Sequence, residues 1–246
     1  TPDSVGYIPF VVRQATGGSR SKILCVIAWN TWQAYNYWGG SSLYYNMGMP
    51  GYGDTTVSFR RPFVNFHWDC CDVTTQLGQL DSRERQFIAW AENNGYPMEY
   101  CVDGDIHRAG STGFLTPYKM AVFPGHSEYW SREQRRSVED STFGFKGNLG
   151  GNLLFLAANN CYWKVKYYSS GAANNPDSMA CNKWFPAGTA LYRSTVEQGD
   201  TLFEARLVGN QFMAVNDSNT SSIVDNASHW VFMGTGLNND DRFGLG

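Results

Sequence analysis

KILCVIA, residues 22–28, contains a continuous apolar run that starts at Ile23. A run of this length without polar alternation is typical of a strand that is buried on both faces. Such strands form parallel sheets whose two faces are covered by helices. The stretch therefore predicts the first strand of an α/β sheet.

Helix and strand patterns alternate through the first two thirds of the chain. Helices are predicted from about residue 30 to the Gly39-Gly40 pair, over residues 82–94, and over residues 131–140. The second of these follows Asp81-x-x-Glu84, a capping-box pattern. Further apolar strands are predicted over residues 98–102, 118–123 and 153–157. This order predicts a doubly wound, mostly parallel α/β sheet.

The helical period disappears from about Cys161 onward. Short strands separated by Asn, Ser and Gly are predicted over residues 189–193, 202–208, 212–215 and 229–233. No repeat or low-complexity linker divides the chain. We therefore expect a single domain over residues 1–246, with an α/β core at 1–160 and a β-rich extension at 161–246.

Composition excludes several classes of protein. The 246 residues are 42% hydrophobic and 17% charged, which fits neither a disordered chain nor a coiled coil. The net charge is −3 and Lys and Arg are not clustered, so neither nucleic acid nor an anionic membrane is expected as a partner. Apolar runs such as residues 23–29 are too short to span a bilayer. The composition predicts a soluble globular protein.

Cysteines and glycosylation signals favour a secreted or extracellular protein. The six cysteines are Cys25, Cys70, Cys71, Cys101, Cys161 and Cys181. The lack of a C-x-x-C motif disfavours a zinc ribbon or a thioredoxin-like site, and we expect an oxidising compartment with one or two disulfides. Sequons for N-glycosylation begin at Asn216, Asn219 and Asn226, in a polar stretch. We expect a secreted, disulfide-bonded glycoprotein.

Polar segments follow three of the predicted elements, at residues 29–44, 125–130 and 159–163. Because ligands bind beyond the carboxyl ends of parallel strands, we expect these segments to converge. His126 and Glu128 are two residues apart and share one side of an extended chain, where they can bind a metal or move a proton. The alternative is that Glu128 or Ser127 caps the following turn and His126 forms a local hydrogen bond.

Tyr35 and Tyr44 raise a second hypothesis. A phenol ionises near pH 10 and needs a strong Lewis acid to do so at neutral pH. Two phenolates and a carboxylate would form a hard, anionic oxygen site that suits ferric iron. Aromatic packing is the alternative for any single tyrosine, since the chain contains 14.

Two other motifs carry weaker signals. Ser127 lies in G-H-S-E-Y, which lacks the second glycine of a nucleophile elbow, so a serine hydrolase remains an alternative. Asp103, Asp105 and His107 resemble part of a metal loop, but no EF-hand pattern follows. For that segment the sequence predicts a solvated loop.

Longer segments carry a family resemblance. They are NTWQAYNYWGGSSLY (30–44), VSFRRPF (57–63), GHSEYW (125–130) and GGNLLFLAANNCYW (150–163). These segments resemble the C-terminal domain of the N,N-dimethylformamidase large (beta) subunit family. The resemblance begins near Ile8 and continues to HWVFMGTG (229–236), so it covers nearly the whole chain. It implies a glutamine-amidotransferase-like α/β fold.

The resemblance also implies an amidohydrolase whose iron is held by two tyrosines and one glutamate. Matched residue by residue, Glu128 would be the carboxylate ligand. Tyr44 and Tyr35 would be the phenolate ligands, with Tyr7 or Tyr37 as alternatives. The cofactor implied is Fe³⁺.

Two further roles follow from the same resemblance. His126 would transfer a proton beside the metal, and Asn159 would lie near the substrate. The leading hypothesis is a metal-dependent amidohydrolase-like domain that cleaves the C–N bond of a small amide, with dimethylformamide itself disfavoured. The alternative is a secreted structural or binding module with the same fold and no activity, assembled as a homo-oligomer or within a larger extracellular particle.

Overall fold

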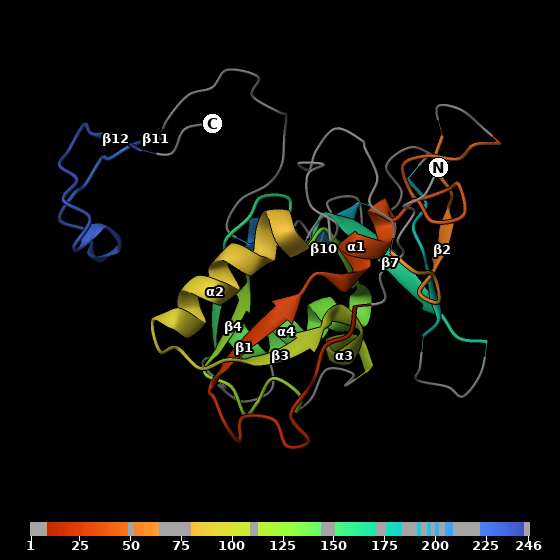
Figure 1. Ribbon diagram of the computed structural model, residues 1–246, viewed down its shortest axis with the longest axis horizontal. Helices are drawn as coiled ribbons and strands as arrows, with labels where there is room; N and C mark the ends of the chain where they lie inside the picture. The colour runs from red at the N-terminus through yellow and green to blue at the C-terminus, as the bar shows by residue number, and fades with distance from the viewer. Residues whose placement is uncertain are drawn as a thin grey trace, which may run out of the picture. The chain divides into compact units, whose positions relative to one another are not determined.

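The computed structural model describes residues 9–48, 52–63, 80–108, 113–143, 151–170, 176–183, 191–192, 196–197, 200–201, 205–208 and 222–243. The chain divides into two compact units, Thr1–Phe212 and Met213–Gly246. The first unit contains the predicted sheet (Figure 1). No helix in the described part of the chain has the length and apolar character needed to cross a membrane.

A parallel sheet forms the centre of the first unit. Its strands lie in the order β3 (Glu99–Val102), β1 (Ile23–Ile27), β4 (Met120–Phe123) and β6 (Asn152–Phe155). Each neighbouring pair is parallel. The strand predicted from KILCVIA is therefore confirmed, and it lies inside the sheet with a neighbour on each side.

Helices cover both faces of this sheet. The α-helices in the described part of the first unit are α1 (Trp29–Tyr35), α2 (Arg85–Asn93), α3 (Asp103–Arg108), α4 (Arg132–Phe143) and α5 (Ala205–Val208). Leu24 of β1 belongs to the same buried cluster as Val138 of α4. The next residue, Cys25, belongs to a second cluster against which Ile88 of α2 packs. Successive side chains of β1 thus face opposite layers, with α2 in front of the sheet and α4 behind it in Figure 1.

A second, mixed sheet joins segments that are distant in sequence. Its strands lie in the order β2 (Thr56–Ser58), β8 (Ser178–Ala180), β7 (Trp163–Tyr168) and β5 (Tyr129–Ser131). The pair β5–β7 is parallel, whereas β7–β8 and β2–β8 are antiparallel. A short hairpin, β9 (Val196–Glu197) and β10 (Asp200–Thr201), follows later in the chain. Strands of the predicted β-rich extension therefore pair with β2 and β5, which come from the first 160 residues.

Three local predictions are wrong. Residues 103–108 form helix α3 rather than a solvated loop, because Asp103 and Asp105 are buried and hydrogen-bonded. Residues 205–208, predicted as part of a strand, form helix α5. In the second unit, Trp230–Phe232 form a 3₁₀ helix, although residues 229–233 were predicted as a strand. The strands described in this unit are β11 (Ser222–Ile223) and β12 (Arg242–Phe243). The predicted strand at 212–215 lies outside the described residues.

The cysteines do not support the expected disulfides. Cys25, Cys101, Cys161 and Cys181 are free thiols and are buried. Burial raises the pKa of Cys181 to about 12, which keeps this thiol protonated at neutral pH. Cys70 and Cys71 lie outside the described residues. The four described cysteines therefore act as small apolar side chains in the core.

The strand order places a ligand site at one position. The chain passes from β1 through α1 and α2 to β3 on one side of β1, and then to β4 on the other side. The order therefore reverses between β1 and β4. Open α/β sheets bind ligands beyond the carboxyl ends of the two strands at such a switch point. Those ends lead into α1 and into residues 124–128.

A buried carboxyl supports the loop after β4. Glu84, at the end of the π-helical turn η1 (Leu80–Glu84), is fully buried, and its Oε1 accepts a hydrogen bond from Ala28 N at 2.9 Å. Gly125 lies directly against it, because a Cβ there would be 2.6 Å from Glu84 Cγ. Only glycine therefore lets the loop pass over this carboxyl.

Glu84 makes the stability of the fold depend on pH. Burial, together with the negative charge of Asp103, raises the pKa of Glu84 from 4.5 to about 8, although the Ala28 hydrogen bond opposes the shift. Because the folded pKa is the higher one, this stabilisation is complete below about pH 4.5. It is lost as the pH rises through 8.

We therefore expect Glu84→Gln to flatten the decline of Tm with pH. Between pH 5 and pH 8.5 the variant should lose less stability than the wild type by about 3–5 kcal/mol, the order that a pKa raised from 4.5 to about 8 implies, because Gln has no carboxyl to ionise in the core. Thermal unfolding followed at a series of pH values measures this difference. Glu92→Gln, on the exposed surface of α2, is the matched control and should keep the wild-type slope. Parallel curves for Glu84→Gln and wild type would contradict the assignment.

Candidate functional site

Glu128 lies beyond the carboxyl end of β4, at the switch point. Its side chain is buried, with 2% of the residue exposed. Its backbone N donates to Thr31 Oγ1 of α1 at 3.0 Å, and its carbonyl accepts from the amides of Tyr162 and Trp163. The backbone of Glu128 is thus held by both β1–α1 and the start of β7, which fixes the direction of the carboxylate.

Tyr35 and Tyr44 reach the carboxylate from the segment after β1. Tyr35 is the last residue of α1, and Leu43 N returns to bond Ala34 O at 3.0 Å. The two tyrosine rings consequently stack, with centroids 4.3 Å apart. Gly53 allows this return, because a Cβ there would lie 2.1 Å from the Leu43 carbonyl oxygen. Tyr35 and Tyr44, which are nine residues apart in the sequence, thus lie side by side.

Both phenol hydroxyls contact the Glu128 carboxylate. Tyr44 Oη lies 3.0 Å from Oε2 and 3.2 Å from Oε1. Tyr35 Oη lies 3.2 Å from Oε2. Three oxygen-bearing side chains from separate segments therefore meet at one point, as the sequence hypothesis of a shared oxygen site requires.

His126 and Asn159 complete the surroundings of the carboxylate. His126 Nε2 lies 3.2 Å from Glu128 Oε2, and its Nδ1 lies 2.8 Å from the carbonyl oxygen of Ala158. Asn159 adopts a left-handed backbone with φ of 63°, which asparagine tolerates, and its Nδ2 donates to Glu128 Oε1 at 3.2 Å. The structure brings all five of the side chains selected from the sequence together.

Trp163 is a further contact that sequence reasoning missed. Its Nε1 donates to Glu128 Oε1 at 2.9 Å. The parallel pairing of β5 with β7 places Trp163 directly opposite Tyr129, the residue after Glu128. This register depends on tertiary pairing, which local sequence patterns do not indicate. The aromatic segment NNCYW marked this part of the chain but not its contact with Glu128.

A buried lysine forms a second layer behind Tyr44. Tyr129 Oη donates to Tyr44 Oη at 2.6 Å, and Lys183 Nζ donates to Tyr129 Oη at 2.9 Å. The same ammonium lies 3.2 Å from the centroid of the Tyr44 ring. Lys183 is 9% exposed, so its charge acts on these rings with little screening by water. Neither Tyr129 nor Lys183 was selected from the sequence.

The electrostatics of the site disfavour ionisation of Tyr44 and favour the protonated form of His126. Burial and the negative charge of Glu128 raise the pKa of Tyr44 well above its ordinary value. Burial alone would lower the pKa of His126, but the hydrogen bond and charge of Glu128, with the Ala158 carbonyl, raise it. An additional cation at the carboxylate would be needed to ionise Tyr44 near neutral pH.

Other residues considered from the sequence lie elsewhere. Tyr37 packs against Tyr45 with ring centroids 5.0 Å apart, and Tyr7 is outside the described residues. Ser127 is buried, and its Oγ contacts Asp103 and Trp130 rather than the ring of His126. Within the described ranges no three His, Cys, Asp or Glu side chains are grouped to hold a metal, so a metal here would rely on tyrosine.

The fold and the site together define an open α/β-sheet protein with an oxygen-rich site at its switch point. The family model described as N,N-dimethylformamidase beta subunit-like, C-terminal, matches residues 2–246. The chain belongs to this family, which confirms the resemblance found in the sequence.

Curated relatives are similar over part of their length. The N,N-dimethylformamidase beta subunit of Paracoccus aminophilus is 24% identical over 199 residues, which cover 68% of this chain and 25% of that protein. The N,N-dimethylformamidase beta subunit of an Alcaligenes species is 23% identical over 199 residues, with the same coverage. The chain thus spans about a quarter of the length of the curated relatives that it matches.

The hydrogen bond from Glu128 N to Thr31 gives a test of how the carboxylate is positioned. Thr31 is 1% exposed, so Thr31→Val keeps the shape of the side chain and removes the acceptor. We expect a loss of about 1–2 kcal/mol in the free energy of unfolding, measured by chemical denaturation. Thr31→Ser keeps the hydroxyl and should lose less. Equal losses in the two variants would show that the hydroxyl does not hold the loop.

Proposed function

We propose that this chain hydrolyses the C–N bond of a small amide, using ferric iron held by Tyr35, Tyr44 and Glu128. The observation that carries the proposal is the convergence of two phenol oxygens on one buried carboxylate, at 3.0–3.2 Å. Curated relatives are named N,N-dimethylformamidase beta subunits, which supports an amide as the substrate class. Because those relatives are named as subunits, we also propose that the chain works within a larger assembly.

The chemistry of the donor set fits ferric iron. Phenolate and carboxylate are hard oxygen donors, and they match a small, highly charged cation better than zinc or copper. Three protein donors leave coordination positions for substrate or water, as catalytic metal sites require. When bound, the iron would polarise the amide carbonyl or lower the pKa of a bound water. The charge of the cation would also offset the burial that disfavours ionised Tyr44.

His126 is the proton donor in this proposal. Its two ring nitrogens face acceptors, the Ala158 carbonyl and the Glu128 carboxylate, so both positions favour an N–H. An imidazolium held in this way can give a proton to the departing amine, which would otherwise leave as an unstable anion.

Asn159 orients the substrate in this proposal. Its Nδ2 is committed to Glu128, while its Oδ1 is buried without a hydrogen-bond partner in the described structure. A buried acceptor without a partner is costly unless a ligand or water satisfies it. An amide substrate with an N–H would do so, which favours primary and secondary amides over dimethylformamide.

The family resemblance also implies a glutamine-amidotransferase-like fold, which we retain as part of the proposal. The strand order β3-β1-β4-β6 supports it. If the four strands of this sheet are renumbered along the chain, the order reads 2-1-3-4, as in flavodoxin-like doubly wound sheets. The site at the switch point then corresponds to the general ligand position of that class of fold.

Iron binding is tested with tyrosine variants. The purified chain should bind about one equivalent of iron and show a visible tyrosinate-to-iron charge-transfer band. Tyr35→Phe and Tyr44→Phe should each lose or shift this band, because each removes one phenolate donor. Tyr37→Phe, whose ring packs on Tyr45, is the matched control and should leave it unchanged. An unchanged band in both Tyr35→Phe and Tyr44→Phe would contradict the ligand assignment.

Activity is tested by amine release from formamide, N-methylacetamide and dimethylformamide. Glu128→Gln should abolish turnover together with iron. His126→Gln should retain iron and lower kcat about 10²–10⁴-fold, the usual contribution of a positioned general acid. Folded wild-type protein that holds no iron and releases no amine would instead favour a binding or structural module.

A further inference from the structure

A separate cavity lies beyond the carboxyl ends of β1 and β3. It is lined by Trp29 and Asn30, which begin α1, and by Val102 and Gly104, where β3 passes into α3. Its volume is about 140 Å³. A cavity of about this size accommodates one benzene ring. The carboxyl edge of a parallel sheet is also where α/β proteins bind small molecules.

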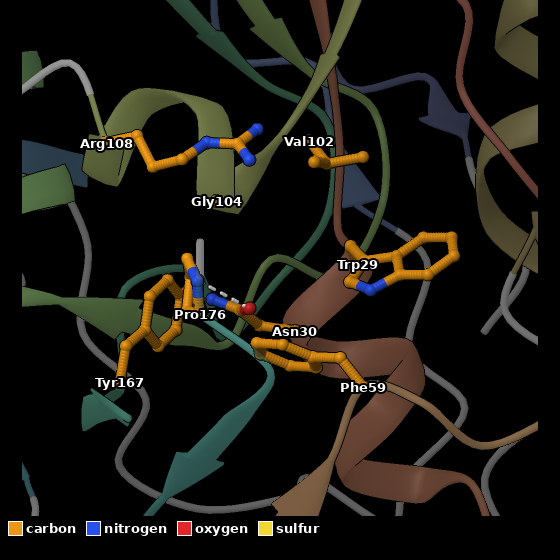
Figure 2. Close-up of a pocket in the computed structure, with 8 residues that line it drawn as sticks. All are labelled: Trp29, Asn30, Phe59, Val102, Gly104, Arg108, Tyr167 and Pro176. Carbon is orange, nitrogen blue, oxygen red and sulfur yellow. Dashed lines mark hydrogen bonds between the residues drawn. The ribbon is translucent and has the colours of Figure 1, made fainter. Parts of the chain in front are cut away.

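Aromatic rings form much of the wall of this cavity. Figure 2 shows the rings of Tyr167 and Phe59 on one side and that of Trp29 on another. Phe59 and Tyr167 meet edge to face, with centroids 5.6 Å apart and an interplanar angle of 87°. Two rings at right angles form a corner that contacts both the face and the edge of a planar guest. The shape therefore favours a flat ring over a branched aliphatic chain.

Asn30 keeps this aromatic wall in place. The residue is 1% exposed, and both the nitrogen and the oxygen of its side-chain amide form hydrogen bonds. Its Nδ2 donates to the Tyr129 carbonyl at 2.7 Å, and its Oδ1 accepts from Tyr167 Oη at 2.6 Å. The Tyr167 ring is consequently held in position before any ligand enters, which lowers the entropic cost of binding.

A positive charge faces the aromatic wall. Arg108 of α3 lines the cavity on the side opposite Tyr167 and Phe59 (Figure 2). Arg108 Nη2 and Arg13 Nη1 both bond Oδ1 of the buried Asp105. A guanidinium has five N–H donors in a fork that matches a carboxylate, and it can bind Asp105 and a second anion together.

We propose that this cavity binds a small aromatic carboxylate, with its ring against Tyr167, Phe59 and Trp29 and its carboxylate at Arg108. The proposal does not depend on the iron site, because none of the side chains that line this cavity contacts Glu128 through a hydrogen bond or ion pair described here.

Benzoate is the probe that tests this proposal by isothermal titration calorimetry on the whole chain. We expect one benzoate per chain. Benzamide, a neutral molecule of the same shape, should bind at least about tenfold more weakly, because it lacks the charge that Arg108 recognises. Cyclohexanecarboxylate should also bind more weakly, because its ring is not flat. Absence of benzoate binding, or equal affinity for benzoate and benzamide, would overturn the proposal.

Variants locate the binding site. A Cβ at Gly104 would have no heavy atom within 4 Å, so Gly104→Leu can occupy the cavity without a clash at its first atom. Gly104→Leu and Arg108→Gln should each weaken benzoate binding about tenfold or more, and Arg85→Gln on α2 should not. Glu128→Gln should also leave the affinity unchanged, which separates this site from the proposed iron site.

Unchanged affinity in folded Gly104→Leu and Arg108→Gln would place benzoate elsewhere and overturn the proposal. If either variant is unfolded, the comparison with benzamide and the other variant decide.

Discussion

The arrangement of the site depends on how the buried carboxylate of Glu128 is surrounded by donors. A carboxyl group that is 2% exposed is costly unless hydrogen-bond partners replace water. Those donors come from α1, from the turn after it, from the loop after β6 and from β7, so the fold must bring four segments to one point. The grouping that satisfies the carboxylate also places two phenol oxygens where one cation could reach all three side chains.

The loop that carries Glu128 is held by contacts that leave little freedom. Gly125 passes over the buried Glu84, and Thr31 accepts the hydrogen bond of Glu128 N. Behind the phenols, Lys183 bonds Tyr129, which in turn bonds Tyr44. Glu84, Thr31, Tyr129 and Lys183 are buried, and the carboxylate position is therefore determined by tertiary packing rather than by the flexibility of a surface loop.

The parallel sheet could be predicted because its strands are marked by short-range signals. The apolar run of β1 and the alternation with helices indicated a doubly wound sheet, and the structure agrees. Helix α3 could not be predicted in this way, since burial of Asp103 requires the side chain of Gln134 from α4, 31 residues away. The mixed sheet was not predicted either. Its strand β5 is only three residues long and pairs with β7, which starts far along the chain at Trp163.

The candidate site was predictable only in part. His126 and Glu128 stand out through local spacing after a strand, and the tyrosines through a family resemblance. Trp163 and Lys183 were missed, because their contacts join residues 35 and 54 positions apart and a tryptophan or lysine has many structural roles. Iron-edge anomalous diffraction from crystals grown with iron shows directly whether a cation binds at Glu128. We expect a single peak within coordination distance of Tyr35 Oη, Tyr44 Oη and the Glu128 carboxylate; no peak there, with the phenol–carboxylate hydrogen bonds intact, would contradict the proposed iron site.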